Sequence, residues 1–316
     1  MAYLDALKDV AKRIVPAPLR HLLRWTAGYR LRGLSSAQYW TRHNVTEHRA
    51  FASTAESLDY FDWRNIQYPG YIDLMPVNDG TGKVVLDYGC GPGNDLVGFT
   101  TQSKPARLIG ADVSPSSLAE AKARLAVHGA HAVELVQLDP ADSALPFATA
   151  SIDLIHSAGV LHHLPHIKDT LREFRRLIRD DGYAQIMVYN YDSIWMHLYA
   201  GYLYRKRVPW QAKLPKQELF KATTDGEHCP IVNSFAPAEF CAIADRAGFD
   251  TEFRGAAVSL NEMSWLPQRL EALKDPALDR DSRNFLAGLT FDVRQTPLHR
   301  GQAAGINGCF RLTPKP

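Results

Sequence analysis

A turn with three glycines between residues 85 and 94, VLDYGCGPGN, constrains the fold of this chain more than any other segment. An apolar run ends there in the acid Asp87, and glycines follow at positions 89, 91 and 93. Glycine has no Cβ and tolerates positive φ, so the main chain of such a turn can approach a ligand that side chains would exclude. We therefore interpret the segment as a strand followed by a ligand-binding loop.

The residues around this turn favour a cationic or zwitterionic ligand over a phosphate. A Walker-type phosphate loop carries Lys followed by Ser or Thr after its last glycine, whereas Asn94 and Asp95 stand there in this chain. The dinucleotide fingerprint places its third glycine one residue later, which disfavours a nicotinamide oxidoreductase. In addition, Asp87 and Asp95 would repel a pyrophosphate.

Strand and helix signals alternate from residue 84 onward, which is typical of an α/β fold with a mostly parallel sheet and helices on both faces. Ser114 and Pro115 form a helix start signal, and Asp181-Gly182 is a stop signal after the apolar spacing that begins at Ile167. A further helix is predicted over residues 237–247, before Gly248. The predicted strands are 84–87, 108–112, 133–138, 152–156, 184–189, 251–258 and 307–312.

Residues 84 to 93 resemble the first motif of class I S-adenosylmethionine-dependent methyltransferases of the type-11-like Rossmann group, which reads apolar-apolar-L-D-x-G-C-G-x-G. Three later segments follow in the family's order: LIGADVSP from 108, ALPFATASIDLIHSAGVLHHL from 144 and LREFRRLIRDDGYAQIMVY from 171. The resemblance implies a Rossmann-like fold with a seven-stranded sheet that closes with an antiparallel hairpin. It also implies a methyltransferase (EC 2.1.1 class) that uses S-adenosyl-L-methionine and releases S-adenosyl-L-homocysteine.

The same resemblance implies where the cofactor would bind. Asp112 would accept hydrogen bonds from the ribose hydroxyls, with capping of the next helix as its alternative role, and Val113 would pack on the adenine. Asp139 would contact the adenine amino group, but Pro140 lacks the N–H that usually follows it, so Asp142 is a competing candidate. The predicted cofactor-binding residues are Asp87, Gly89, Cys90, Gly91, Gly93, Asp112, Val113, Asp139 and Ser157.

Asp87 is implied to lie near the methionyl amine of the cofactor, where the main-chain carbonyls of Gly89 and Ser157 would also face it. A cationic amine needs acceptors of this kind. The alternative for Asp87 is a buried carboxylate bonded by the amides of the loop itself, and both descriptions can hold at once.

Methyl transfer from a sulfonium is an in-line displacement, so the enzyme mainly aligns the nucleophile and excludes water. A hydroxyl acceptor gains from a general base, and His matches neutral pH. His228, beside Asp225 and Glu227, and His163, in the segment VLHHLPH, are the candidate bases, with a solvated loop and a structural role as their alternatives. No metal site is predicted at the histidines 162, 163 and 166, because no fourth ligand lies nearby.

Two segments rich in aromatic residues are predicted to cover the site. The first is an N-terminal helical arm over residues 1–75, and the second is a helical insertion at about 190–235 within a methyltransferase domain of residues 76–316. Packing in the core is the alternative for both. The candidate substrate-binding residues are Tyr39, Trp40, His43, Trp63, Arg64, Trp195 and Tyr199.

Composition limits the class of protein and its partners. A chain of 316 residues with 46% apolar and 22% charged residues is globular and not disordered or fibrous. Without an apolar run of membrane-spanning length, and with four scattered cysteines, we expect a cytoplasmic protein with reduced thiols. The first fifty residues hold nine Lys or Arg against three acids, which favours peripheral contact with an anionic membrane, whereas nothing indicates nucleic-acid binding.

These features together predict methyl transfer to a small-molecule or glycan-type acceptor, at oxygen. N-methylation of a small metabolite is the alternative within enzymes. A non-catalytic protein that binds S-adenosylmethionine is the alternative from another class.

Overall fold

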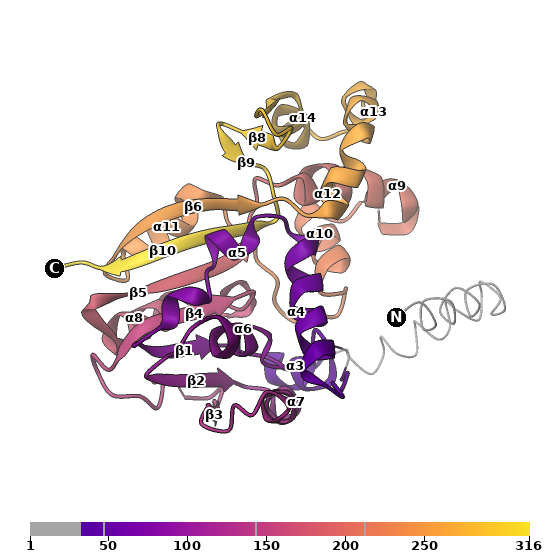
Figure 1. Cartoon of the computed structure of the whole chain (residues 1–316). Coiled ribbons are helices and arrows are strands. Elements are labelled where there is room, and N and C mark those ends of the chain that lie inside the picture. Colours follow the sequence, from indigo (N-terminus) through magenta and orange to yellow (C-terminus); the bar gives the residue numbers. More distant parts are fainter. Residues whose placement is uncertain (1–32, 47, 143, 212) are drawn as a thin grey trace.

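The computed structural model describes residues 33–46, 48–142, 144–211 and 213–316 (Figure 1). Seven strands form one sheet in the order β3-β2-β1-β4-β5-β10-β6. The first five run parallel, and β10 pairs antiparallel with both β5 and β6. This confirms the predicted Rossmann-like α/β sheet. Its strands are β1 (Val84–Tyr88), β2 (Arg107–Asp112), β3 (Glu134–Gln137), β4 (Ile152–Ala158), β5 (Ile178–Tyr189), β6 (Phe249–Ala257) and β10 (Asn307–Pro314).

Both faces of this sheet are buried, as expected for parallel strands. Successive side chains of a strand point to opposite faces. Val85 therefore packs with one apolar cluster, which includes Phe61 and Phe99, while Leu86 packs with the other, which includes Phe174. The helices on the Val85 face are α4 (Thr54–Gln67), α6 (Asn94–Gln102) and α7 (Pro115–Val127), and those on the Leu86 face are α8 (Ile167–Leu177) and α11 (Pro237–Asp245).

Two helix boundaries show how local signals work in this chain. Ser114 caps α7 by accepting a hydrogen bond from the Ser117 N–H at 3.1 Å, and Pro115 is the first helical residue, as the sequence predicts. In contrast, α8 ends at Leu177, and the predicted stop pair Asp181-Gly182 lies inside β5. Gly182 is needed there for space, because a Cβ at this position would lie 2.7 Å from the Asp153 carbonyl oxygen.

The N-terminal part of the described chain forms α3 (Ser36–Arg42), α4, α5 (Tyr71–Leu74) and the short 3₁₀ turn η1 (Asn78–Gly80). The basic stretch from residue 8 to 32, with its predicted membrane contact, lies outside the described residues. None of the helices in the described ranges combines the length and the apolar character that crossing a bilayer requires.

The insertion after β5 contains η3 (Trp195–Tyr204), α9 (Arg205–Arg207), η4 (Pro209–Gln211) and α10 (Lys216–Thr224). The first of these is a π-helix of ten residues, a rare conformation that is frequent at functional sites. Its buried residues Met196 and Ala200 pack with Leu219 and Phe220 of α10. The insertion is therefore a folded layer with its own apolar contacts.

A second folded segment separates β6 from β10, where the sequence predicts only a closing hairpin. It consists of α12 (Leu260–Trp265), η5 (Leu266–Gln268), α13 (Arg269–Lys274), α14 (Arg280–Ala287) and a small antiparallel sheet of β7 (Leu289–Phe291), β8 (Pro297–His299) and β9 (Gln302–Ala303). It lies above the ends of β6 and β10 in Figure 1. We call residues 259–306 the C-terminal subdomain. Its apolar residues pack on Ile194, Leu198 and Tyr202 of the insertion.

Glu262 joins the two ends of the C-terminal subdomain to each other and to the insertion. Its buried carboxylate accepts hydrogen bonds from the N–H groups of Ser259 (2.8 Å), Trp195 (3.0 Å) and Ile306 (3.2 Å), and from the Ser259 hydroxyl (2.8 Å). Burial raises the pKa of Glu262 to about 7, although these donors oppose the shift. All four partners are donors, so this position requires a group that only accepts.

Replacing Glu262 by Gln places an N–H₂ group against at least one of these backbone donors. We expect E262Q to lower the free energy of unfolding by about 1–3 kcal/mol, the usual consequence of leaving a buried donor unpaired. Chemical denaturation measures this change. The matched control is E252Q, because the Glu252 side chain on β6 is 62% exposed. Equal stability of E262Q and the unmodified protein would contradict this description.

Candidate active site

The glycine loop leaves β1 with three residues in the left-handed region. Gly89, Gly91 and Gly93 have φ values of +75°, +51° and +79°. A Cβ on Gly89 would lie 2.2 Å from a methyl carbon of Val160, so the loop packs tightly against the chain that follows β4. A Cβ on Gly91, in contrast, would meet no atom within 4 Å. The main chain at Gly91 therefore borders open space.

Asp112 ends β2 beside this loop. Its carboxylate accepts hydrogen bonds from the N–H groups of Gly91 (2.9 Å) and Ser114 (2.8 Å). Burial raises the pKa of Asp112, and these bonds oppose the shift. Asp112 thus holds both the glycine loop and Ser114, the residue that caps α7. Val113, the next residue, is partly buried against the core.

A buried cluster of charged groups lies at the start of α6. Both terminal guanidinium nitrogens of Arg64, on α4, donate to the Asp95 carboxylate. The bond from Nη1 to Oδ2 measures 3.3 Å. His156 of β4 lies on the other side, with its Nε2 3.2 Å from Asp95 Oδ2. Because His156 Nδ1 accepts from the Gln185 amide at 2.8 Å, Nε2 carries the proton that faces Asp95. Arg64, a predicted substrate residue, is therefore held against the cofactor loop.

Asp87 lies among these charges and is incompletely paired. It is 2% exposed, and its Oδ2 atom has no hydrogen-bond partner among the described residues. Burial raises the pKa of Asp87 to about 7, with His156 opposing the shift and Asp95 reinforcing it. A buried acceptor without a partner costs about 1–3 kcal/mol, so this atom is suited to receive a donor from a ligand.

The other residues predicted to bind cofactor differ in environment. Cys90 and Ser157 are buried, and the Ser157 hydroxyl donates to the Tyr88 carbonyl at 3.0 Å. Asp139 is exposed just beyond β3, and its carboxylate accepts from the Ala141 N–H at 2.8 Å. Asp139 therefore stands at a strand end as predicted, with one oxygen already engaged in a local turn.

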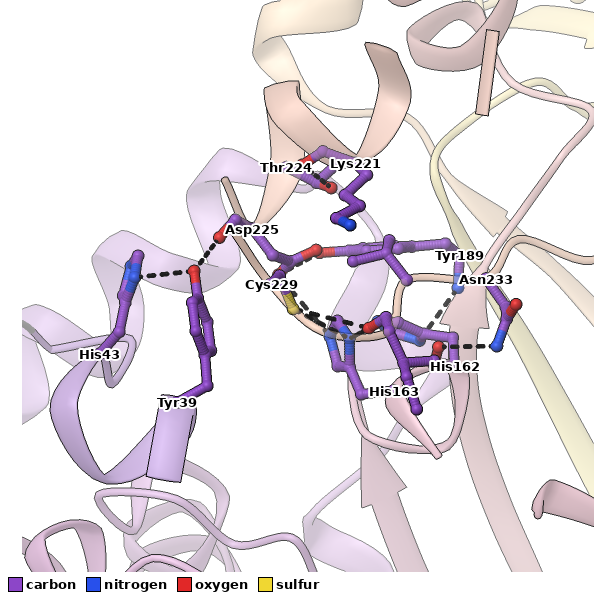
Figure 2. A network of polar contacts seen from close by, with 12 residues as sticks. Tyr39, His43, His162, His163, Tyr189, Lys221, Thr224, Asp225, Cys229 and Asn233 are labelled. Carbon is purple, nitrogen blue, oxygen red and sulfur yellow. Dashed lines mark hydrogen bonds and ion pairs between the residues drawn. The ribbon is translucent and has the colours of Figure 1, made fainter. Parts of the chain in front are cut away.

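A second polar cluster is centred on Asp225, at the end of α10 (Figure 2). The hydroxyl of Tyr39 on α3 donates to the Asp225 carbonyl oxygen and lies 3.0 Å from His43 Nδ1. The Tyr189 hydroxyl, at the end of β5, donates to Asp225 Oδ1 at 3.2 Å. His163 Nε2 lies 3.6 Å from the same oxygen. Asp225 thus connects the N-terminal arm, the insertion and the end of the sheet.

His163 has a defined orientation within this Asp225 cluster. It lies on the 3₁₀ turn η2 (Leu161–His163), directly after β4, and its Nδ1 donates to the Ile231 carbonyl at 2.7 Å. Nε2 therefore carries the lone pair in the neutral imidazole. Burial lowers the pKa of His163, and the Asp225 carboxylate opposes this. The Trp40 ring covers the imidazole with centroids 4.8 Å apart.

The neighbouring histidines have different surroundings. His162 is fully buried, stacks on Tyr189 with centroids 3.9 Å apart, and accepts from the Tyr189 N–H at 3.3 Å. Burial lowers the pKa of His162 well below its usual value. His228 pairs with Glu227 at 3.1 Å instead of joining the Asp225 cluster. Of the two predicted bases, the structure brings only His163 together with Asp225.

Three of the predicted substrate residues make contacts other than the polar ones of these clusters, although Trp195 shares an apolar cluster with Tyr39 and Tyr189. Trp63 projects from α4 with 45% of its surface exposed. Tyr199 stacks on Trp265 of α12 with centroids 3.9 Å apart, and Trp195 meets the same ring edge-on at 4.9 Å. The aromatic residues of η3 therefore join the insertion to the C-terminal subdomain.

Sequence reasoning did not select several residues that organise this region. Tyr189 and His156 are the last residues of two predicted strands. Because ligands bind at the carboxyl ends of parallel strands, their position is the sequence signal that points to them. Asp95 was considered only as a charge that repels phosphate. Asp225 was considered only as a partner of His228, because its contacts with Tyr39 and His163 join segments that are far apart in the chain.

Comparisons with known proteins agree with this geometry. A family model described as a methyltransferase domain matches residues 86–184. The chain is 27% identical over 231 residues to the Aspergillus luteorubrus protein named "Probable methyltransferase ltbC", a match that covers 66% of this chain and 74% of that protein. It is 30% identical over 130 residues to trans-aconitate 2-methyltransferase of Methylobacterium nodulans, which covers 38% of this chain and about half (47%) of that enzyme.

The fold also matches a solved structure with its cofactor product. Phosphoethanolamine N-methyltransferase 2 of Haemonchus contortus, in complex with phosphomonomethylethanolamine and S-adenosylhomocysteine, superposes with a TM-score of 0.51 at 16% identity and covers 90% of this chain and 60% of that one. The strand order, the glycine loop at its centre and the matched domain agree with one another. Residues 86–184 therefore form a methyltransferase domain, and the protein, which is similar to S-adenosylmethionine-dependent methyltransferases, is an enzyme that uses S-adenosylmethionine as its methyl donor.

Proposed function

We propose that this enzyme methylates a hydroxyl group of a small-molecule acceptor, with His163 as the general base. The observation that carries the proposal is the fixed orientation of His163, whose Nδ1–H is held by the Ile231 carbonyl while Nε2 faces Asp225. When Nε2 accepts a proton, the Asp225 carboxylate 3.6 Å from that nitrogen stabilises the resulting imidazolium.

The glycine loop and the strand ends fit the cofactor. Asp87 Oδ2, which no group in the described ranges pairs, is available to accept a bond from the methionyl ammonium, and the open space beside Gly91 allows the ligand to lie against the main chain. Asp112, held by the Gly91 and Ser114 N–H groups, would bond the ribose hydroxyls. S-adenosylmethionine supplies a methyl group that is activated by the positive charge of its sulfur.

Methylation at oxygen and methylation at nitrogen differ in whether the acceptor must lose a proton during the attack. A hydroxyl must lose its proton as it attacks, so a base raises the rate, whereas a neutral amine attacks with its lone pair and needs less assistance. His163 is mainly neutral at pH 7 because burial lowers its pKa. The paired His163 and Asp225 therefore favour a hydroxyl acceptor over the alternative, an amine of a small metabolite.

The N-terminal arm and the insertion would cover the acceptor. Tyr39 of α3 bonds to Asp225 at the end of α10 (Figure 2), and the neighbouring Trp40 ring lies against His163. Exclusion of water by such a cover strengthens the electrostatic interaction between the imidazolium and the carboxylate. Trp63, Trp195 and Tyr199 are not included in this proposal, because they lie outside the Asp225 cluster.

Replacing His163 by Gln removes the base but keeps a hydrogen-bonding side chain. We expect H163Q to lower kcat by about 10²–10⁴-fold and to remove the acid limb of the pH profile. Binding of S-adenosylhomocysteine, measured by calorimetry, should stay unchanged. H166Q is the matched control, because His166 is exposed and its side chain makes no capping bond. A larger loss in H228Q than in H163Q would contradict the assignment.

Asp225 is expected to act through His163 as a positioning residue. The carboxylate raises the pKa of His163, so D225N lowers that pKa further and makes the imidazole a weaker base. We expect kcat to fall about 5–150-fold and the acid limb of the kcat/KM profile to move to lower pH. E218Q serves as control, since the Glu218 side chain is 53% exposed. A fall in kcat without movement of the limb would contradict this role.

The raised pKa of Asp87 makes cofactor binding depend on pH. The ammonium of the ligand favours the ionised carboxylate, so affinity for S-adenosylhomocysteine should rise about tenfold from pH 6 to pH 8, with release of a proton. Calorimetry in buffers of different ionisation enthalpy measures both effects. D87N should bind weakly and without this dependence, whereas D180N, at a 94% exposed side chain, should behave like the unmodified enzyme. A pH-independent affinity would be evidence against the role of Asp87.

A further inference from the structure

The C-terminal subdomain and the insertion border an open cavity of about 460 Å³ that the proposed function does not use. It is formed by η3, by one face of α14, and by the turn between β8 and β9, in the part of Figure 1 above the ends of β6 and β10. Pockets for small molecules usually measure about 300–1,000 Å³. The size is therefore sufficient for a metabolite.

The wall of this cavity contains a buried donor without a partner. His197, on the π-helix, is 1% exposed, and its Nδ1 lies 3.1 Å from Lys216 Nζ and 3.3 Å from the Ser282 hydroxyl. Since the lysine ammonium can only donate, Nδ1 accepts and the proton of the neutral ring is on Nε2. Burial, followed by the charge of Lys216, lowers the pKa of His197 to about 3. Nε2 has no partner in the described part of the chain.

Lys216 also fixes the surroundings of His197. Its ammonium pairs with Asp281 at 2.6 Å, and the same Asp281 oxygen accepts from the Tyr191 hydroxyl at 2.6 Å. The imidazole stacks on Phe285 with centroids 4.2 Å apart. The position of His197 is therefore set by contacts on several sides, as expected of a preorganised binding group.

Two unpaired charges of opposite sign complete the wall. Asp192 and Arg300 both line the cavity, and among the residues that the structure describes neither has an ion-pair partner. Arg300 lies in the turn between β8 and β9, where its backbone adopts the left-handed conformation with a φ of +50°. His299 beside it has an Nδ1 atom without a partner in the same described ranges. A ligand that carries one charge only would leave the opposite wall charge uncompensated.

We propose that this cavity binds a small zwitterionic molecule of the α-amino acid type. Its carboxylate accepts from His197 Nε2–H and from Arg300, and its ammonium donates to Asp192. The uncharged Asn284 and Thr290, which also line the cavity, are available for a polar side chain of the ligand. The site is separate from the cofactor loop and does not depend on the nature of the methyl acceptor.

The full-length enzyme, saturated with S-adenosylhomocysteine, is the material for the test, because the methionyl part of that ligand then fills the cofactor site. Free α-amino acids are screened by thermal shift, and hits are measured by calorimetry. The matched compounds are the α-hydroxy acid and the decarboxylated amine of each hit, with glucose as a neutral polyol. We expect at least one amino acid to bind and its matched compounds to bind at least tenfold more weakly.

Variants locate the binding. D192N and R300Q should each weaken affinity for the amino acid at least tenfold, while R294Q, at an exposed arginine outside the cavity, should leave it unchanged. Absence of binding for all amino acids, equal binding of the hydroxy acid or of glucose, or unchanged affinity in both D192N and R300Q would each overturn the proposal. The activity of the enzyme toward its acceptor is not part of the readout, so a failure of the proposed base leaves this test intact.

Discussion

The main constraint on this molecule is the burial of carboxylates at the C-terminal edge of its parallel strands. Asp112 ends β2, and Asp87 is the last residue but one of the neighbouring strand β1; both are almost fully buried, so their negative charges need donors at close range. Main-chain N–H groups of the loop supply them to Asp112. Glycine is favoured at position 91 because the main chain that makes one of these bonds has a φ of +51° there, in the left-handed region. Asp87 keeps one carboxylate oxygen, Oδ2, without a partner in the described part of the chain, which is the feature that suits a cationic ligand.

The same constraint explains why segments distant in sequence meet at this edge. Arg64 of α4 forms an ion pair with Asp95 beside the loop, and the hydroxyls of Tyr39 and Tyr189 donate hydrogen bonds to Asp225. Each contact joins segments that are far apart in the chain through a buried or partly buried polar group. Removal of one member would leave the other unpaired, which makes such contacts more consequential than ion pairs on the surface.

The parts of the structure that were predictable depend on local patterns. The strands were found because apolar runs end at glycine or acid residues, and α7 was found because Ser114 and Pro115 determine its start within a few residues. The C-terminal subdomain was missed because its helices have eight residues or fewer, too short for a clear apolar period, and depend on packing against η3. The pairing of His163 with Asp225 was also beyond sequence reasoning, since it depends on how the insertion folds back over β4.

The most direct test of this account is a crystal structure of the enzyme with S-adenosylhomocysteine. We expect the ligand amine within hydrogen-bond distance of Asp87 Oδ2, the ribose hydroxyls on Asp112, and the sulfur directed toward His163. A ligand bound elsewhere, or an amine held by other groups while Asp87 Oδ2 stays without a partner, would contradict the central claim that the buried strand-end carboxylates form the cofactor site.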